Sequence, residues 1–200
     1  MNGMGMSVAT LGAVLWALGG IAWYVIRYPF ERRARRTQVV LNRRSPVDMC
    51  GLGAAMLGMG LVPAIYVATG FLASADYPAG AFRVVLGAAL FFAAVWLFRR
   101  THKELGKNWS ITLEIRDKHK LISGGPYSLV RHPMYTSFLM MAVGQALLLA
   151  NWFVGLAGLA GFAALFFLRV DREERMMLDT FGTDYRDYMD RTKRIIPFVY

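Results

Sequence analysis

The sequence predicts an all-α integral membrane protein with five transmembrane helices, its N-terminus outside and its C-terminus in the cytoplasm. The chain has 200 residues, a length that suits a single domain. Three observations support this fold class: an apolar composition, five long apolar runs, and the confinement of positive charge to alternate connections. Apolar residues make up 56% of the chain and the mean hydropathy is +0.38. An ordinary soluble domain is nearer 45–50% apolar, roughly, even with glycine included.

The apolar runs have the length of membrane spans, since a helix needs about 20 apolar residues to cross the bilayer core. The runs are 4–26, 47–72, 79–98, 134–150 and 152–168. Only Asn151 separates the last two, which are also the shortest, so we expect them to form a tight antiparallel helical hairpin. The first run is not expected to be a signal peptide, because no Lys or Arg precedes it and seven arginines follow between Arg27 and Arg44.

The distribution of positive charge predicts the orientation. Segments 27–44, 99–133 and 169–200 carry nearly all of the Lys and Arg residues, whereas residues 1–26 and 73–78 carry none. Positive residues stay on the cytoplasmic side of a membrane. The net charge of +10 therefore does not indicate nucleic-acid binding, because the basic residues lie in short segments between apolar runs.

We divide the chain into two parts. Residues 1–98 form three transmembrane helices with a basic cytoplasmic loop at 27–44. Residues 99–200 form the second part, which consists of a cytoplasmic loop, the helical hairpin and a C-terminal cytoplasmic segment. Cys50 is the only cysteine, so no internal disulfide is possible. The three histidines lack metal-ligand spacing, and we expect no bound metal.

Small and polar residues within the runs predict how the helices pack. Glycine and alanine at helical spacing allow helices to approach closely; these residues are Gly51, Ala55, Gly58, Gly155, Gly158 and Gly161. Pro63 is expected to kink the second helix. Gln145 is almost the only polar residue deep in a span, and this scarcity disfavours a transporter.

A polar, turn-rich segment, residues 119–135, precedes the fourth run. Gly124-Gly125-Pro126 predicts a turn, because glycine permits positive φ and proline fixes its own φ. Pro133 suits the first turn of a helix, which places His132 at the helix start, where unpaired N–H groups favour an anionic group. The alternative is an ordinary interface, with basic side chains reaching for water and tyrosines forming an aromatic belt.

A second polar segment, residues 169–197, follows the last run. Arg169 and Glu173 are four residues apart and share a helix face. A solvated helix with ion pairs is the simplest interpretation. However, this helix continues out of a membrane span, so one side still faces other helices, and its carboxylates are candidates for binding a cationic ligand. Phe181-Gly182 predicts the helix end, and residues 195–197 predict a partly buried return toward the membrane.

The two polar segments together resemble the isoprenylcysteine carboxyl methyltransferase family, within a wider group that includes phospholipid N-methyltransferases. The resemblance covers roughly residues 100–200. The matching elements are His119-x-Leu121-Ile122, Ser123-Gly-x-Pro126-Tyr127, Arg131-His-Pro-x-Tyr135, Arg169, Glu173-Glu174, Phe181-Gly182-x-x-Tyr185-x-x-Tyr188 and Pro197.

The resemblance implies a membrane-embedded enzyme that uses S-adenosylmethionine without a Rossmann domain. It implies that Arg169 lies where the carboxylate of the acceptor binds, and that Arg169 and His132 are the catalytic residues. It also implies a cytoplasmic cofactor pocket lined by His119, Lys120, Leu121, Ile122, Tyr127, His132, Pro133, Met134, Tyr135 and Glu173. The double acidic motif is longer in some members of the family, and here Arg172 precedes Glu173.

The expected function is methyl transfer to a lipophilic acceptor, best matched by the carboxylate of an isoprenylcysteine-type substrate. The alternatives are N-methylation of a phospholipid amine, methylation of a small hydrophobic thiol or metabolite, or a non-catalytic membrane scaffold. A carboxylate is already ionised at neutral pH and needs no general base, so Arg169 has only to bind it. An amine or thiol acceptor needs deprotonation, for which His132 is the base at hand.

The expected partners are a prenylated or small lipophilic acceptor and the membrane lipid, with no nucleic acid and no metal. The expected location is a membrane crossed several times by the chain. This is the inner membrane in a bacterium or the endoplasmic reticulum in a eukaryote.

Overall fold

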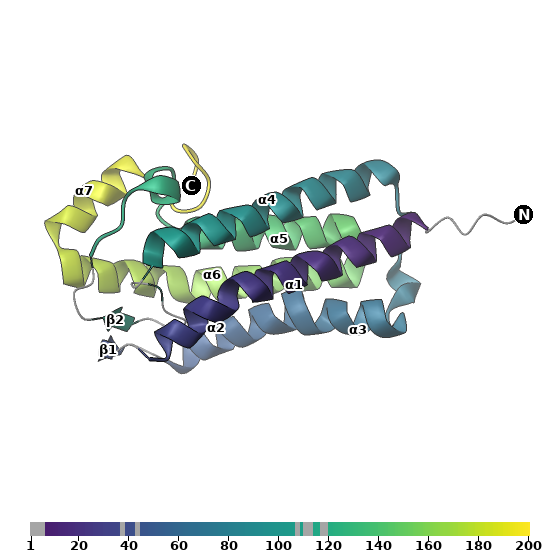
Figure 1. Ribbon diagram of the computed structural model, residues 1–200, viewed down its shortest axis with the longest axis horizontal. Helices are drawn as coiled ribbons and strands as arrows, with labels where there is room; N and C mark the ends of the chain where they lie inside the picture. The colour runs from purple at the N-terminus through teal and green to yellow at the C-terminus, as the bar shows by residue number, and fades with distance from the viewer. Residues whose placement is uncertain (1–6, 37–38, 43–44, 107–108, 110–113, 117–119) are drawn as a thin grey trace, which may run out of the picture.

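Long helices lie side by side along the longest axis of the molecule (Figure 1). The computed structural model describes residues 7–36, 39–42, 45–106, 109, 114–116 and 120–200. Helix α7 and the two short strands gather at one end of the bundle, and the N-terminus lies at the other end. We call the first the polar end, because the polar segments 120–135 and 169–197 lie there.

Helix α1 (Val8–Ala34) continues eight residues beyond the apolar run that predicts it. The side chain of Ser7 caps its start by accepting a hydrogen bond from the backbone of Thr10 at 3.0 Å. Its last turns are held by ion pairs four residues apart: Arg27 to Glu31 at 3.4 Å and Glu31 to Arg35 at 2.7 Å. Such pairs stabilise a helix in water, which explains why α1 outlasts its apolar segment.

The second apolar run forms α2 (Pro46–Met56), a π-helical turn (Leu57–Leu61) and α3 (Val62–Thr69). Ser45 and Asp48 form a reciprocal capping box at the start of α2. The π-helical turn lies just before Pro63, which has no N–H to donate and whose ring crowds the carbonyl four residues earlier. The predicted disturbance at Pro63 is therefore a widened turn in an otherwise continuous helix.

The remaining helices are α4 (Ala81–Leu105), α5 (Pro133–Leu149), α6 (Trp152–Phe181) and α7 (Thr183–Arg191). The predicted hairpin is confirmed, because only Ala150 and Asn151 join α5 to α6. Asn151 Oδ1 caps α6 by accepting from Val154 N at 3.0 Å. As predicted, α6 ends at Gly182, whose positive φ of 56° suits glycine.

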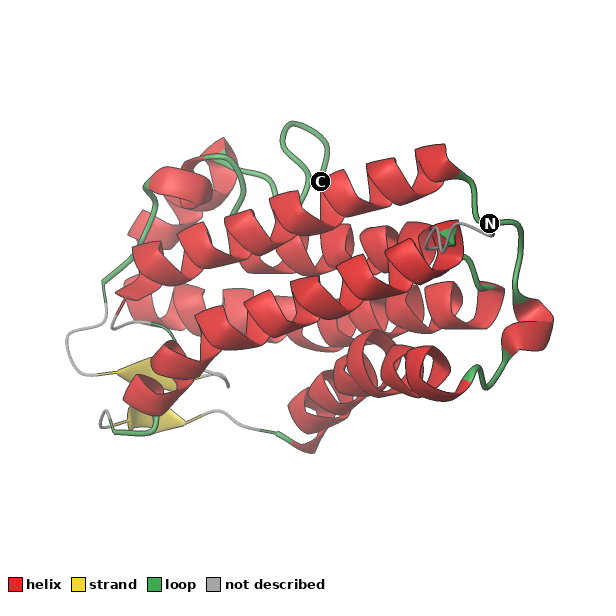
Figure 2. Cartoon of the chain, turned by 45° about the vertical axis from the view of Figure 1, so that its right-hand side comes forward, coloured by secondary structure: helices red, strands yellow, loops and turns green. Residues whose placement is uncertain are grey.

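Two short strands depart from the all-α prediction. Strand β1 (Val39–Asn42) pairs antiparallel with β2 (Glu114–Arg116) and forms a two-stranded ribbon (Figure 2). The ribbon joins the α1–α2 connection to the α4–α5 connection, so both lie at the same end of the bundle. At the opposite end, Asp76 and Asn151 form a bridge between the α3–α4 and α5–α6 connections.

Among the described residues, four stretches of helix are long and apolar enough to cross a membrane. They are 8–34, 46–69, 81–105 and 152–181. Helix α5 is a shorter apolar helix of 17 residues. It is therefore about 25 Å long, against about 30 Å for the bilayer core. The structure thus matches four of the five predicted spans by length, and the fifth lies at the lower limit.

Close packing explains the small residues. A Cβ atom on Gly161 would lie 2.6 Å from the backbone oxygen of Ala54, so α2 and α6 meet backbone to backbone. The buried side chain of Gln145 bonds across the same region, from Nε2 to the Gly58 oxygen at 3.0 Å and to the Val154 oxygen at 2.9 Å. The packing role predicted for the glycines is confirmed, and Gln145 joins helices rather than lining a path.

Two hydrophobic clusters form the core. One lies between α1, α4 and α5 and includes Phe91, Phe98 and Met141. The other lies between α5 and α6 and includes Phe166 and Tyr135. Tyr135 belongs to the first turn of α5, so the second cluster reaches the polar end and holds the side chains described next.

Candidate active site at the polar end of the bundle

The two polar segments meet at the polar end, although about forty residues separate them in sequence. The C-terminal segment after α7 runs beside the residues that precede α5. Arg131 N donates to the Lys193 oxygen at 2.7 Å, and His132 N donates to the Arg194 oxygen at 2.9 Å. The side chain of Thr136 adds a bond to the Ile195 oxygen at 2.7 Å. These bonds fix the start of α5 against the end of the chain.

Glu174 is the centre of a buried ion cluster. Its side chain is 5% exposed. Oε1 accepts from Arg131 Nε at 3.0 Å and lies 3.1 Å from His132 Nε2, while Oε2 accepts from Arg194 Nη2 at 2.7 Å. Burial by itself raises the pKa of this carboxyl, but the hydrogen bonds from His132, Arg194 and Arg131 outweigh burial and lower the pKa to about 2. Glu174 is therefore ionised and fully engaged.

The bond to Glu174 sets the tautomer of His132. An ionised carboxylate only accepts hydrogen bonds, so Nε2 of His132 carries the proton. In the neutral ring Nδ1 is then the acceptor, and it lies 3.9 Å from Glu173 Oε1. His132 immediately precedes α5, as predicted from Pro133, and its ring is buried. The ring thus lies between the two acidic residues of α6 and is hydrogen-bonded to Glu174 alone.

Glu173 differs from its neighbour because it is partly open to solvent. Its side chain is 30% exposed, and Oε2 accepts from the hydroxyl of Tyr135 at 3.0 Å. Arg169, one turn earlier on α6 and mostly buried, lies 3.8 Å from the same oxygen through Nε. Glu173 is the accessible carboxylate of the pair, and Tyr135 and Arg169 orient it.

Tyr127 approaches the same carboxylate from the turn before α5. Gly125 has a φ of 57°, which confirms the turn predicted at Gly124-Gly125-Pro126. Tyr188 on α7 fixes the turn, because its hydroxyl donates to the Tyr127 oxygen at 2.6 Å. Desolvation and the negative charge of Glu173 raise the pKa of Tyr127 well above its ordinary value, so the phenol stays neutral.

Arg172 anchors this part of α6 to α2. Its Nη1 donates to Asp48 Oδ1 at 3.1 Å and to the hydroxyl of Ser45. Asp48 is completely buried. This contact ties the α2 capping box to the residue directly before Glu173.

The structure gathers some, but not all, of the predicted site residues. Around Glu173 it brings together Tyr127, His132, Tyr135 and Arg169. Pro133 is buried in the first turn of α5, but the side chain of Met134 packs toward the α4 core and not toward Glu173. Lys120 is exposed and Leu121 and Ile122 are half-buried. His119 lies outside the described residues. The cofactor pocket and the roles of these residues stay predictions.

Sequence reasoning missed the three residues that hold the site together. Arg131 and Glu174 stand inside the matching motifs but had no assigned role, and Arg194 had none at all. The sequence did contain a signal for Arg131 and Glu174, because each is adjacent to a predicted site residue: Arg131 precedes His132, and Glu174 follows Glu173. For Arg194 no local pattern points to α6.

Comparisons with known proteins agree with this geometry. Residues 84–179 match the sequence model of the isoprenylcysteine carboxyl methyltransferase (ICMT) family. A probable protein-S-isoprenylcysteine O-methyltransferase of Oryza sativa subsp. indica is 35% identical over 89 residues, which cover 44% of this chain and 47% of the relative. The human protein-S-isoprenylcysteine O-methyltransferase is 28% identical over 120 residues, 60% of this chain and 40% of the relative.

The fold has a solved counterpart. The structure of the eukaryotic intramembrane Ras methyltransferase ICMT is similar with a TM-score of 0.55 and 21% sequence identity, over 95% of this chain and 64% of that chain. The present chain spans about half the length of the first curated relatives that it matches, the rice and Arabidopsis proteins. The family resemblance predicted from the sequence is thus confirmed for residues 84–179, which contain Arg131, His132, Tyr135, Arg169, Glu173 and Glu174.

Proposed function

We propose that this protein is an integral-membrane methyltransferase that transfers a methyl group from S-adenosylmethionine to the carboxylate of an isoprenylcysteine-type acceptor. One observation carries the proposal. Polar residues within the family match converge at one end of the bundle, around a partly exposed carboxylate, Glu173, and a buried arginine, Arg169. The relatives named above are themselves isoprenylcysteine methyltransferases.

The side chains at this end suit the chemistry of the proposed cofactor. S-adenosylmethionine supplies an activated methyl group on a sulfonium cation and carries an ammonium group. Glu173 offers a carboxylate to the cationic groups, and its exposure leaves acceptor capacity beyond the bond from Tyr135. The rings of Tyr127 and Tyr135 provide aromatic faces for a cation. His132 completes the wall, held in one tautomer by Glu174.

Arg169 is the proposed ligand for the acceptor's carboxylate. Its position near the end of the apolar part of α6, residues 152–168, places it at the proposed membrane boundary. A guanidinium binds a carboxylate through two parallel hydrogen bonds, which fixes the orientation of the nucleophilic oxygen. Such an acceptor is ionised at neutral pH, so no residue has to remove a proton.

The proposed topology has five spans, with the N-terminus outside and the polar end in the cytoplasm. In this arrangement residues 99–200 form the catalytic core, residues 1–98 supply three supporting spans, and α5 is the short fourth span. The grouping of the α1–α2 and α4–α5 connections at one end supports it, because both carry excess Lys and Arg. Reporter fusions after Tyr77 and after Tyr200 should report opposite sides of the membrane, and same-side signals would refute the arrangement.

The function is tested with the purified full-length protein, methyl-labelled S-adenosylmethionine and a panel of acceptors: prenylcysteines, aminophospholipids and hydrophobic thiols. We expect label in a base-labile ester of the prenylcysteine. Label in a lipid amine or thioether instead would support the alternatives, and no transfer to any acceptor would refute an enzyme of this class.

Direct binding supplies a second criterion. Calorimetry in detergent should detect S-adenosylmethionine and its demethylated product, and Glu173→Gln should weaken both. Asp190→Asn is the matched control, because it makes the same charge change on the exposed surface of α7. Equal affinity of the wild type and Glu173→Gln would place the cofactor elsewhere.

A further inference from the structure

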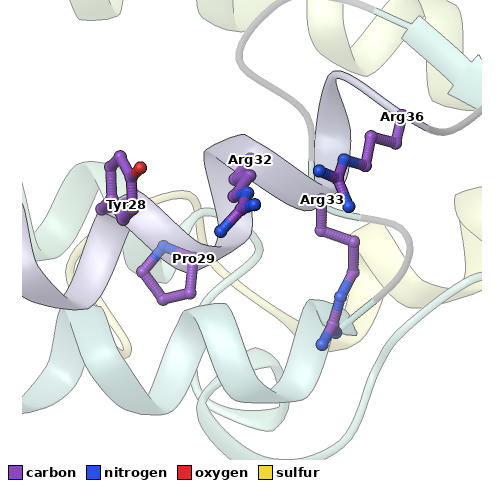
Figure 3. Close-up of a pocket in the computed structure, with 5 residues that line it drawn as sticks. All are labelled: Tyr28, Pro29, Arg32, Arg33 and Arg36. Carbon is purple, nitrogen blue, oxygen red and sulfur yellow. The ribbon is translucent and has the colours of Figure 1, made fainter.

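A surface pocket lies at the polar end of α1, outside the site described above. It has a volume of about 450 Å³ and is lined by Tyr28, Pro29, Arg32, Arg33 and Arg36. Figure 3 shows Arg32 beside Tyr28 and Pro29, with Arg33 and Arg36 farther along at the end of the helix. None of these residues belongs to the proposed cofactor or acceptor site.

The described residues that line the pocket are three arginines, a tyrosine and a proline. Glu31 is the only acidic residue between Arg27 and Arg44. It forms ion pairs with Arg27 and Arg35, neither of which lines the pocket. Guanidinium groups suit an anion with several oxygens, such as a phosphate, and the arginines bring this chemistry to the pocket.

An exposed apolar stripe leads along α1 directly to this pocket. Leu18, Ile21, Val25 and Tyr28 are 51%, 60%, 62% and 52% exposed. They follow one another at spacings of three and four residues, so they lie on one helix face, and Arg32 continues that face after four more. The same face thus changes from apolar to basic at Tyr28, the residue type that favours the interface between hydrocarbon and headgroups.

We propose that this pocket binds the phosphate of an anionic phospholipid, whose acyl chain lies along Leu18, Ile21 and Val25. A free phosphate or soluble nucleotide would use the arginines but not the apolar stripe. General attraction of basic residues to an anionic surface would use the charge but not the pocket. A phospholipid can contact both the arginines and the apolar stripe, because its phosphate is covalently joined to its acyl chains and the stripe meets the pocket at Tyr28.

The test uses the full-length protein in detergent and measures retention of dioleoyl phosphatidylglycerol by native mass spectrometry. We expect saturable binding of this lipid and much weaker binding of the neutral dioleoyl phosphatidylcholine. The variant Arg32→Gln/Arg33→Gln/Arg36→Gln should bind phosphatidylglycerol roughly a hundredfold more weakly, since each arginine near an anionic headgroup contributes about fivefold. Should that variant fail to fold, Arg32→Gln/Arg36→Gln replaces it, because both side chains are exposed.

Matched controls distinguish binding of an anionic lipid from a general charge effect and from binding of a phosphate group alone. Arg175→Gln/Arg186→Gln/Arg191→Gln removes the same charge from exposed positions on α6 and α7 and should keep wild-type binding. Equal loss in both triple variants would show a general charge effect and overturn the site. Equal competition by glycerophosphoglycerol, which has the headgroup but no acyl chain, would identify a phosphate site and overturn the lipid assignment. Equal retention of phosphatidylcholine would also overturn it.

Discussion

The two ends of the bundle provide hydrogen-bond partners for their polar groups in different ways. At the end that holds Asn151, one neutral side chain joins two connections: Asn151 Nδ2 donates to the Leu72 oxygen at 2.8 Å and to Asp76 Oδ1 at 2.6 Å, while Oδ1 caps α6. At the polar end, polar side chains from two separate segments, Arg131-His132 and Arg194, converge on Glu174. The first arrangement closes a hairpin. The second also leaves one acidic residue, Glu173, partly exposed.

This difference indicates which end of the bundle has a functional role. A short connection needs only a cap and a few hydrogen bonds, and one asparagine provides them. A buried carboxylate bonded to two arginines and a histidine is costly to desolvate, so its presence needs a reason beyond closing a turn. We interpret Glu174 as the support that holds His132 while Glu173 stays available.

Removing Glu174 should have the largest effect on stability. Glu174→Ala leaves the buried Arg131 without its carboxylate, although Arg194 keeps its ion pair with Asp171 at 2.8 Å. Losing one partner of a buried ion pair costs about 3–5 kcal/mol. Chemical denaturation in detergent measures this change. Asp187→Ala, an exposed position on α7, should stay within about 0.5 kcal/mol of the wild type. A Glu174 variant as stable as that control would show that the cluster contributes nothing.

Lowering the pH should destabilise the polar end of the bundle before the end that holds Asn151. The folded-state pKa of Glu174 is about 2, below its ordinary value of 4.5. A lowered pKa stabilises the folded state above the unfolded value, and this contribution is lost as pH falls from about 4.5 to about 2. Hydrogen exchange followed over this range should show α7 and residues 192–197 losing protection first. Earlier loss near Asn151 contradicts the expectation.

Replacing Asn151 should have a smaller effect and spare the site. Asn151→Ala removes the α6 cap and two donated hydrogen bonds, which together contribute about 2–3 kcal/mol. Asn151→Asp keeps the capping oxygen but loses the donors beside Asp76, so its stability should be intermediate if the cap matters. Cofactor affinity of the folded Ala variant should equal that of the wild type. A matching loss of affinity would show that the two ends are coupled.

The sequence predicts the elements better than it predicts their contacts. Apolar runs located the long helices, and the single residue Asn151 between two runs predicted the hairpin. Pro133 placed His132 at a helix start. These features depend on local composition and spacing. Helix α1 ends later than predicted because its last turns are stabilised by the ion pairs of Glu31 and not by apolar residues.

The contacts that single-sequence reasoning missed are distant in the chain. Adjacent residues of a helix point about 100° apart, so which of Glu173 and Glu174 faces inward depends on how α6 is rotated against α5. The bond between Arg194 and Glu174 requires the chain to turn back after α7. The β1–β2 ribbon joins segments more than seventy residues apart, and neither shows a strand pattern strong enough to predict the pairing.

Arg169→Ala should impair catalysis more than stability. Losing a charge-assisted hydrogen bond costs about 1.5–3 kcal/mol, which is roughly tenfold to a hundredfold in turnover of a carboxylate acceptor. Arg169→Lys should recover only part, because a single ammonium lacks the two-pronged geometry. Activity, cofactor affinity and melting temperature are measured together. A proportional loss of all three would mean that Arg169 only orients Glu173, and full activity would exclude a role.

The smallest effect on the proposed active site is expected at Arg172, which is next to Glu173 but on a different face of α6. Arg172 is one-third exposed and holds the buried Asp48 at 3.1 Å. Arg172→Gln should cost about 1.5–3 kcal/mol, because the completely buried Asp48 loses a charge-assisted hydrogen bond but still accepts from Ser45 N at 3.0 Å and keeps the capping box. A double-mutant cycle with Ser45→Ala measures the coupling of the anchor to the cap. Since Arg172 points to α2 and not to Glu173, cofactor affinity and turnover should follow the wild type. A tenfold or larger loss of cofactor affinity with unchanged stability would move Arg172 into the cofactor site and would make α2 part of the active site.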